Sequence, residues 1–138
     1  KIASIRWGAT NRDGCWYARK TCWNNGRYKT LLMHRLILDA PRGQIIDHIN
    51  GDGLDNRRCN LRFCTYQQNK QNSKRYATSS TGYKGVHRRS INRYRCIIRV
   101  GGKHLPLGNF SDPIDAARAY DAAARKHYGE FARLNFPD

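Results

Sequence analysis

The chain has 138 residues, of which 26 are Lys or Arg and 10 are Asp or Glu, so its net charge is +16 with neutral histidines and its pI is near 10.2. This length suits one ordinary domain or two small ones, since domains below roughly 60 residues bury little surface. No apolar run reaches the roughly 20 residues that span a bilayer, and no basic-then-apolar leader precedes Trp7. We therefore expect a soluble cytoplasmic protein with a polyanionic partner, rather than a surface made basic only for solubility.

The first predicted elements are strands. The stretches CWYARKT and RYKTLLMHRLIL are separated by Asn24, Asn25 and Gly26, a hairpin-turn signal, and predict a small antiparallel sheet. Next, QIIDHI and LRFCT predict two short strands around a long turn. Thr65 and Gln68 then form a predicted capping box that opens a helix over YQQNKQN.

A second group of elements follows the polar stretch 73–82, SKRYATSSTG, which we expect to be a linker. GYKGVHRR, RYRCIIRV and KHLPLGNF predict three strands, with a tight turn at Gly101 and Gly102. Asp112 is expected to cap a helix that has Pro113 at its first position and Gly129 after its last turn. Its small and aromatic residues recur at helical spacing and predict a helix that packs closely on the sheet: Ala116, Ala117, Tyr120, Ala123, Ala124 and Tyr128.

The two halves carry equal positive charge. Residues 1–72 and 73–138 each contain 13 Lys/Arg and 5 Asp/Glu, a net charge of +8. Both halves are therefore expected to contact the polyanion. In the strand RYRCIIRV, alternation predicts one face with Cys96, Ile98 and Val100 and an opposite face with Arg95, Ile97 and Arg99.

Four polar residues suggest chemistry. Asp47 and His48 are adjacent, Asn60 follows the histidine by twelve residues, and Asn69 lies nine residues further on. Phosphodiester cleavage needs a general base, which His48 can supply, and positive charge near the reacting oxygens. Asp47 and the amide oxygen of Asn69 are hard ligands suited to one Mg²⁺ or Mn²⁺ ion. Asn60 would orient the imidazole or brace the loop.

Two observations weigh on this hypothesis. Neighbours on a regular strand face opposite sides, so Asp47 and His48 converge only if the strand ends or bulges there, which Asn50 and Gly51 favour. The alternative is that the polar residues of this stretch are ordinary turn formers: Asp47, Asn50, Asp52, Asp55 and Asn56.

The segments HRLIL, IDHINGDGLDNRRCNLRF and YQQNKQN, within residues 30–72, resemble the HNH endonuclease family, in the subgroup common among phage and intron-encoded homing enzymes. The resemblance implies a ββα-metal nuclease with His48 as general base, Asn60 as orienting residue, and Asp47 and Asn69 as metal ligands. Many members have His where this chain has Asn69. His34 is expected to be packed or DNA-facing rather than a ligand.

The five cysteines are expected to be free thiols. Some HNH proteins hold a structural zinc with two CxxC pairs. The spacings here are seven residues between Cys15 and Cys22 and five between Cys59 and Cys64, so a zinc site is not expected. Cys96 is predicted to belong to the core.

The stretch from Tyr83 to Pro137, with YKGVHRR, RYRCIIRV, LGNF, AARAYDAAARK and GEFARLNFP, is similar to the AP2 DNA-binding domain along nearly its whole length. The similarity implies a three-stranded antiparallel sheet in the major groove, backed by one helix. Plant members have tryptophans on the first and third strands, where this chain has Ile91 or Asn92 and Pro106. The residues then expected to face DNA are Lys84, His87, Arg89, Arg95, Arg99 and His104.

We therefore predict an α+β protein with an HNH nuclease domain at 1–72, a linker at 73–82 and an AP2-type domain at 83–138. The predicted function is a metal-dependent DNA endonuclease of the homing or phage type, acting on double-stranded DNA as a nicking monomer. No membrane or small-molecule substrate is expected. The alternatives are a DNA-binding protein whose nuclease fold no longer cleaves, and an RNA-binding or RNA-cleaving protein.

Overall fold

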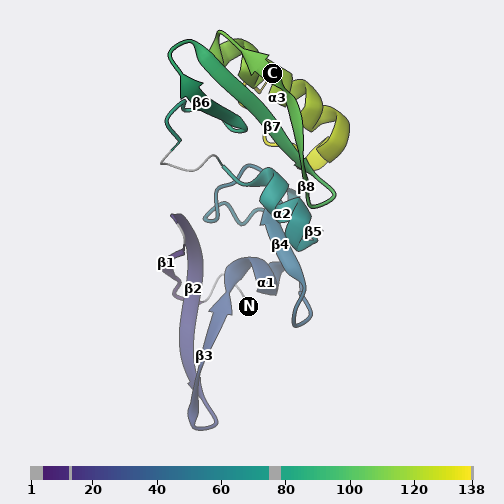
Figure 1. Cartoon of the computed structure of the whole chain (residues 1–138). Coiled ribbons are helices and arrows are strands. Elements are labelled where there is room, and N and C mark those ends of the chain that lie inside the picture. Colours follow the sequence, from purple (N-terminus) through teal and green to yellow (C-terminus); the bar gives the residue numbers. More distant parts are fainter. Residues whose placement is uncertain (1–4, 13, 75–78, 138) are drawn as a thin grey trace. The chain divides into compact units, whose positions relative to one another are not determined.

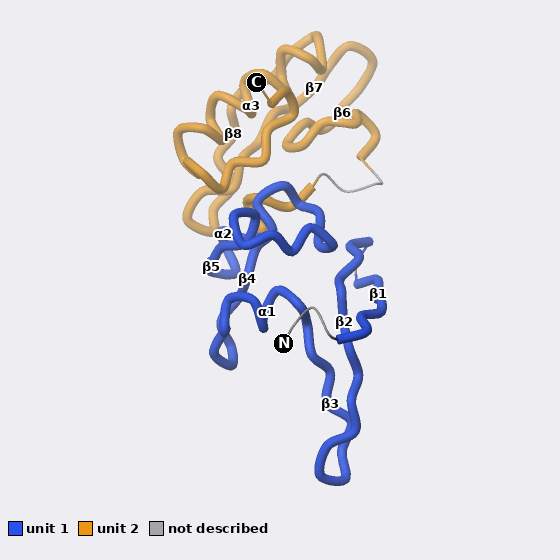
Figure 2. Tube along the Cα trace, turned by 180° about the vertical axis from the view of Figure 1, so that it is seen from behind, with its two compact units in different colours: residues 1–69 blue, residues 70–138 orange. Residues whose placement is uncertain are grey.

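The structure is a computed structural model that describes residues 5–12, 14–74 and 79–137. The chain forms two compact units, residues 1–69 and residues 70–138 (Figure 2). The predicted α+β class is confirmed: a small antiparallel sheet comes first along the chain, and a three-stranded antiparallel sheet packed on a helix comes last (Figure 1). The predicted linker 73–82 includes residues 75–78, which lie outside the described residues. The domain limits 1–72 and 83–138 remain a prediction.

The first unit begins with the predicted hairpin. Strands β1 (Gly8–Arg12), β2 (Cys15–Asn24) and β3 (Arg27–Leu32) form an antiparallel sheet in that order. Asn25 and Gly26 have left-handed backbone angles, φ 47° and 75°, which a tight hairpin turn requires and which these two residue types tolerate. The pairing of β1 ends where Gly8 meets Arg19, so the described part of the sheet is two-stranded beyond Arg19.

One expectation for this unit was wrong. The stretch RYKTLLMHRLIL does not remain in the sheet, because the chain leaves it after Leu32 and forms the short helix α1 (Met33–Ile37). Met33, Leu36 and Ile37 stand at helical spacing, a period that a run of aliphatic residues hides. The guanidinium of Arg35 then fixes the following turn by donating to three carbonyl oxygens, those of Ala40, Pro41 and Gln44.

The predicted strand–loop–strand–helix unit is confirmed. Strand β4 (Ile45–His48) pairs with β5 (Leu61–Cys64) in an antiparallel ladder, and the 3₁₀ turn η1 (Arg58–Asn60) leads into β5. Helix α2 (Tyr66–Asn72) follows. Its capping box has both expected bonds: the Gln68 N–H donates to Thr65 Oγ1 at 3.2 Å, and the Thr65 N–H donates to Gln68 Oε1 at 2.8 Å.

The second unit is the predicted sheet and helix. Strands β6 (Val86–Ser90), β7 (Arg93–Val100) and β8 (Lys103–Phe110) are antiparallel in that order, and α3 (Pro113–Tyr128) is followed by the 3₁₀ turn η2 (Gly129–Phe131). The Asp112 carboxylate caps α3 by accepting from the Ile114 N–H at 2.6 Å, and Pro113 is its first residue, as predicted. Gly129 follows the last turn.

The core of this unit lies between α3 and the sheet. Val86, Cys96 and Ile98 pack on four helix residues whose small or flat side chains allow a close approach: Ala116, Ala117, Tyr120 and Ala124. The predicted alternation along β7 is thus confirmed on its apolar side. The first strand begins later than expected, because Gly85 takes φ 78° directly above Tyr120, and a side chain there would overlap the tyrosine ring.

A buried carboxylate on α3 bonds the segment that follows η2. Asp121 on α3 is 2% exposed and accepts hydrogen bonds from the backbone N–H of Asn135 and of Phe136, both at 2.8 Å. The Asn135 side chain also donates to Asp121 at 3.0 Å and bonds the backbone of Lys84 in both directions. One asparagine therefore joins the segment before β6 to the segment after η2.

Two further findings concern the whole described chain. All five cysteines are free thiols, and Cys96 is fully buried in the core, as predicted. In the described ranges, no helix has the length and apolar character that a membrane crossing requires.

Candidate active site and DNA-binding residues

Asp47 lies in the middle of the β4–β5 pair and is 5% exposed. Arg62 stands directly opposite on β5, and its Nε donates to Asp47 Oδ2 at 2.9 Å, while its Nη2 forms an ion pair with the same oxygen at 2.8 Å. Both side chains are largely buried, so one oxygen of the carboxylate is fixed by an ion pair and a charge-assisted hydrogen bond. Arg62 was not predicted from the sequence, because a cross-strand partner can be identified only when the register is known.

His48 ends β4 and is also buried, but it has different neighbours from Asp47. Its ring lies 5.2 Å from the His34 ring and 5.9 Å from the Tyr17 ring, measured between centroids. Its Nε2 is 3.4 Å from Asn56 Oδ1. Because an amide oxygen only accepts, this contact selects the Nε2–H tautomer, in which Nδ1 is the proton-accepting nitrogen.

The charge of this imidazole is set by burial. Burial lowers the pKa of His48 below its usual range, although the Asn56 contact and the carboxylates of Asp47, Asp52 and Asp55 act in the opposite direction. The adjacent residues Asp47 and His48 therefore interact electrostatically, while their side chains have separate contacts.

His34 is packed, as expected from the sequence. It is 8% exposed, its ring lies 5.8 Å from that of Tyr17, and its Nδ1 is buried with no hydrogen-bond partner among the described residues. Burial, aided by the charges of His48 and Arg35, lowers the pKa of His34 to about 4. The His34 ring contacts both the Tyr17 ring and the His48 ring edge to face, and Tyr17 is a second residue that the sequence did not reveal.

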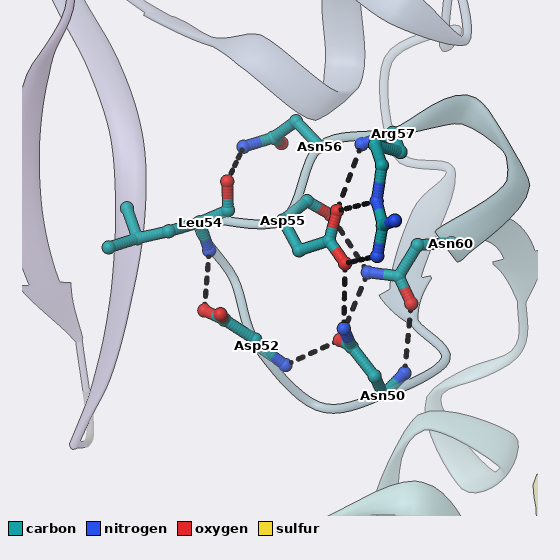
Figure 3. Close-up of polar contacts among 7 residues, drawn as sticks. All are labelled: Asn50, Asp52, Leu54, Asp55, Asn56, Arg57 and Asn60. Atoms are coloured by element: carbon teal, nitrogen blue, oxygen red, sulfur yellow. Dashed lines mark hydrogen bonds and ion pairs between the residues drawn. The ribbon is translucent and has the colours of Figure 1, made fainter.

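The loop after His48 is built from turn-forming residues (Figure 3). Asn50 Nδ2 donates to Asp55 Oδ2, the Asp52 N–H donates to Asn50 Oδ1, and Arg57 forms a two-pronged ion pair with Asp55. Arg57 lowers the pKa of Asp55 to about 2. For Asn50, Asp52 and Asp55, the turn-former alternative thus describes what the side chains do. It does not describe Asp47, which lies in a strand.

Asn60 braces this loop. Its Oδ1 accepts from the Asn50 N–H at 3.0 Å, and its Nδ2 donates to Asn50 Oδ1 at 3.0 Å and to the Asp55 carbonyl at 2.8 Å (Figure 3). Its own carbonyl accepts from the Ile49 N–H at 2.9 Å. Both side-chain amide protons of Asn60 are thus donated within the loop, and Asn60 accepts from the backbone N–H groups of Ile49 and Asn50, the two residues after His48. Of the two roles considered for Asn60, this geometry favours bracing.

Asn69 lies on α2 and is half-buried, with its backbone N–H bonded to the Thr65 carbonyl at 3.0 Å. Asp47 and Asn69 both act on the Cys64 thiol: burial raises the pKa of Cys64, the Asp47 charge raises it further, and the Asn69 N–H lowers it. The described residues hold no cluster of three or more His, Cys, Asp or Glu side chains that would form a metal site. A Mg²⁺ ion commonly takes only one or two protein oxygens, so the donor pair Asp47 and Asn69 fits it chemically.

In the second unit, the predicted DNA-binding residues occupy the sheet. His87 pairs with Arg95 across β6 and β7, and Arg99 pairs with His104 across β7 and β8. His87, Arg89, Arg99 and His104 are exposed, and Arg95 is half-buried. A shallow groove on the sheet is lined by the basic residues His87, Arg88, Arg89, Arg99 and His104, together with Ile97 and Ile98.

Lys84 differs from this expectation. It precedes β6, and its ammonium group donates to the carbonyl oxygens of Gln71, at 2.5 Å, and Ser73, at 2.7 Å. Burial and the nearby charge of Arg133 lower the pKa of Lys84 to about 8. The prediction that Lys84 lies on the first strand was wrong, because the strand starts only after Gly85.

Comparison with known proteins gives two separate similarities. A model of the HNH endonuclease family matches residues 32–71. An uncharacterized HNH endonuclease, L560, from Acanthamoeba polyphaga mimivirus is 32% identical over 105 residues, which are 75% of this chain and 54% of that protein. The chain thus spans about half the length of this relative.

The C-terminal part is similar to plant proteins. Dehydration-responsive element-binding protein 2A from Oryza sativa subsp. indica is 44% identical over 62 residues, 44% of this chain and 23% of that protein. Dehydration-responsive element-binding protein 2C from Arabidopsis thaliana is 47% identical over 58 residues, 41% of this chain and 17% of that protein. The chain therefore combines a segment at residues 32–71 that matches the HNH endonuclease family with a C-terminal part homologous to the AP2-type domain of these plant proteins.

Proposed function

We propose that this protein is a metal-dependent DNA endonuclease whose first unit hydrolyses the phosphodiester and whose second unit holds the duplex. The observation that carries the proposal is the pair of buried residues at the end of β4, the Asp47 carboxylate and the His48 imidazole, followed by a loop braced by Asn60. Inert turns rarely bury a carboxylate and an imidazole side by side, since each must be compensated by dedicated partners.

In the proposed reaction, His48 accepts a proton from the attacking water, because a neutral imidazole with a fixed tautomer can act as a base near neutral pH. Asn60 holds the backbone that follows His48 and so limits the movement of the ring. Asp47 and Asn69 would hold one Mg²⁺ or Mn²⁺ ion, which would stabilise negative charge on the phosphate oxygens. Arg62 would hold the Asp47 carboxylate in place.

The second unit is proposed to bind duplex DNA through its sheet. His87, Arg89, Arg95, Arg99 and His104 present basic groups on one surface, and Arg can grip phosphates or read guanine with two hydrogen bonds. The net charge of +16 supports a partner of this kind. We further propose an enzyme of the homing or phage type that cuts one strand at a time.

The test is cleavage of supercoiled plasmid by the full chain, with and without Mg²⁺ or Mn²⁺. His48→Ala should lose most of the activity, because general-base assistance is typically worth about 10² to 10⁴ in rate. Its DNA affinity should stay near that of the parent. Asn69→Ala should instead raise the metal concentration required. His127→Ala, at an exposed position in the last turn of α3, is the matched control.

The result separates the proposal from its rival. Binding of duplex DNA by the parent without any metal-dependent cleavage would favour a DNA-binding protein whose nuclease fold no longer cuts. Cleavage by His48→Ala at the parental rate would refute the assignment of the base.

A further inference from the structure

The β2–β3 hairpin carries two large aromatic side chains that lie open to solvent. Trp23 is 63% exposed and Tyr28 is 77% exposed, and they stand opposite each other near the turn. Their rings touch edge to face, with centroids 4.7 Å apart. Both views of the chain show this hairpin extending away from the rest of the first unit (Figures 1 and 2).

The charged residues of the outer hairpin, residues 19–31, are all basic. Residues 19–31 contain no Asp or Glu, and four of them are basic: Arg19, Lys20, Arg27 and Lys29. A two-stranded β-ribbon has the width that fits the major groove of B-DNA. In that groove, basic side chains contact phosphates and apolar side chains contact the thymine methyl groups at the base edges.

Strand alternation connects these rings to the candidate active site. Tyr17, Arg19, Thr21 and Trp23 are two residues apart along β2 and therefore share one face of the sheet, with Tyr28 opposite Trp23. Tyr17 on this face contacts the His48 ring. The same face thus begins at the candidate general base and ends at the aromatic pair.

A purely structural role for the two rings is the main alternative. A cross-strand aromatic pair stabilises a hairpin and would help one that is two-stranded at this point. That role explains the contact between the rings. It does not explain why residues 19–31 contain no Asp or Glu, or why both rings remain mostly exposed to solvent.

We propose that the outer β2–β3 hairpin, residues 19–31, is a second DNA-contacting element that enters the major groove to one side of the cut, with Trp23 and Tyr28 against the base edges and Arg27 and Lys29 near the phosphates. The inference rests on the proposed endonuclease function. Six residues of strand separate Tyr17 from Trp23, about 20 Å at roughly 3.3 Å per residue. Since DNA rises about 3.4 Å per base pair, the aromatic pair contacts the duplex about six base pairs from the cut.

The direct test uses tryptophan fluorescence of the full chain, without divalent metal, titrated with a mixed-sequence DNA duplex. A variant with Trp7→Phe and Trp16→Phe keeps Trp23 as the only tryptophan. Its matched control carries Trp7→Phe and Trp23→Phe and keeps Trp16, which is 52% exposed on the opposite face of the same strand. Duplex DNA should quench Trp23 emission in a saturable, salt-reversible way and should leave Trp16 emission nearly unchanged. Equal responses from the two would overturn the inference.

A second measurement separates DNA contact from folding. Trp23→Val with Tyr28→Val keeps good strand-forming residues, so the hairpin should persist by circular dichroism. The affinity for duplex DNA should fall about tenfold. Trp16→Val should bind like the parent. If the double variant binds DNA like the parent, or instead loses self-association of the chain, the DNA contact is refuted.

The two proposals can fail separately. A parent protein that cuts plasmid while Trp23 does not respond to DNA would refute only the hairpin contact. A parent that neither binds nor cuts DNA would refute the proposed function and the hairpin contact with it.

Discussion

Gly53 offers a sharp test of how the loop after His48 is placed. This residue is buried against β2, and a methyl group on its Cα would fall well inside contact distance of the Trp16 carbonyl oxygen and 2.8 Å from the Tyr17 ring. Gly53 does not have a left-handed backbone, so the effect of Gly53→Ala is steric. Because Trp16 lies on the central strand of the sheet, the loop must move rather than the strand.

The size of the effect follows from this geometry. Overpacking of a tight site typically costs about 1–3 kcal/mol of folding free energy. Asn56 is three residues further along the same loop, and its 3.4 Å contact with His48 Nε2 is already longer than an average hydrogen bond. A loop shift of about 1 Å would break that contact, and misplacement on this scale can lower a catalytic rate by about 10²-fold.

The assay combines urea denaturation with plasmid cleavage. Gly53→Ala should unfold at lower urea and should cut DNA much more slowly, while its affinity for duplex DNA changes little. Gly8→Ala is the matched control, because a methyl group at Gly8 would meet only an ordinary contact, 3.8 Å from the Arg19 carbonyl oxygen. Parental cleavage by Gly53→Ala, with an unchanged urea midpoint, would refute the reasoning.

Three further predictions test other parts of the chain. Replacing Arg95 and Arg99 together by Ala should weaken duplex binding and reduce the slope of log affinity against log salt concentration by roughly 0.9 per lost phosphate contact. Arg118→Ala on α3 should weaken binding less, and equal losses of affinity would show that the sheet does not face DNA. Burial raises the pKa of Cys96 from 9.0 to about 11. The neutral thiol therefore stabilises the fold fully below pH 9, and this contribution, up to about 2 kcal/mol, is lost as the pH rises toward 11. The unfolding free energy of Cys96→Ala should vary less with pH over that range than the unfolding free energy of the parent. On a plasmid time course, nicked circles should accumulate before linear DNA, because one active site cuts one strand per binding event; immediate linear product with a steep dependence on protein concentration would indicate paired copies.

The features predicted correctly from the sequence are mostly local. The Thr65 and Gln68 capping box, the Asp112 cap and the Asn25–Gly26 turn each depend on residues within a few positions of one another. Strand alternation likewise identified Cys96 as a core residue. Such signals are visible in a single sequence because the interacting groups are neighbours along the chain.

The features that were missed depend on long-range contacts. Arg62 meets Asp47 only through the β4–β5 register, and Tyr17 reaches His48 from a strand more than thirty residues earlier. Lys84 was expected on the first strand, and the contacts of its ammonium group with the Gln71 and Ser73 carbonyl oxygens join residues more than ten positions apart. The Asp47–His48–Asn60–Asn69 roles stay predictions, because the DNA and metal that would define them are partners rather than parts of the fold.

The hydrogen bonds around Asp121 and Asn135 couple two segments of the second unit. The Asn135 side chain bonds both the N–H and the carbonyl oxygen of Lys84, and the Asp121 carboxylate accepts from the N–H groups of Asn135 and Phe136. The segment before β6 and the segment after η2 are therefore held by the same hydrogen-bond network. Neither segment can fray alone without leaving a buried carboxylate or amide unpaired, which costs about 1–3 kcal/mol. The amide protons of Lys84, Asn135 and Phe136 should therefore exchange with solvent at a common slow rate, as one cooperative opening event rather than as loosely held ends.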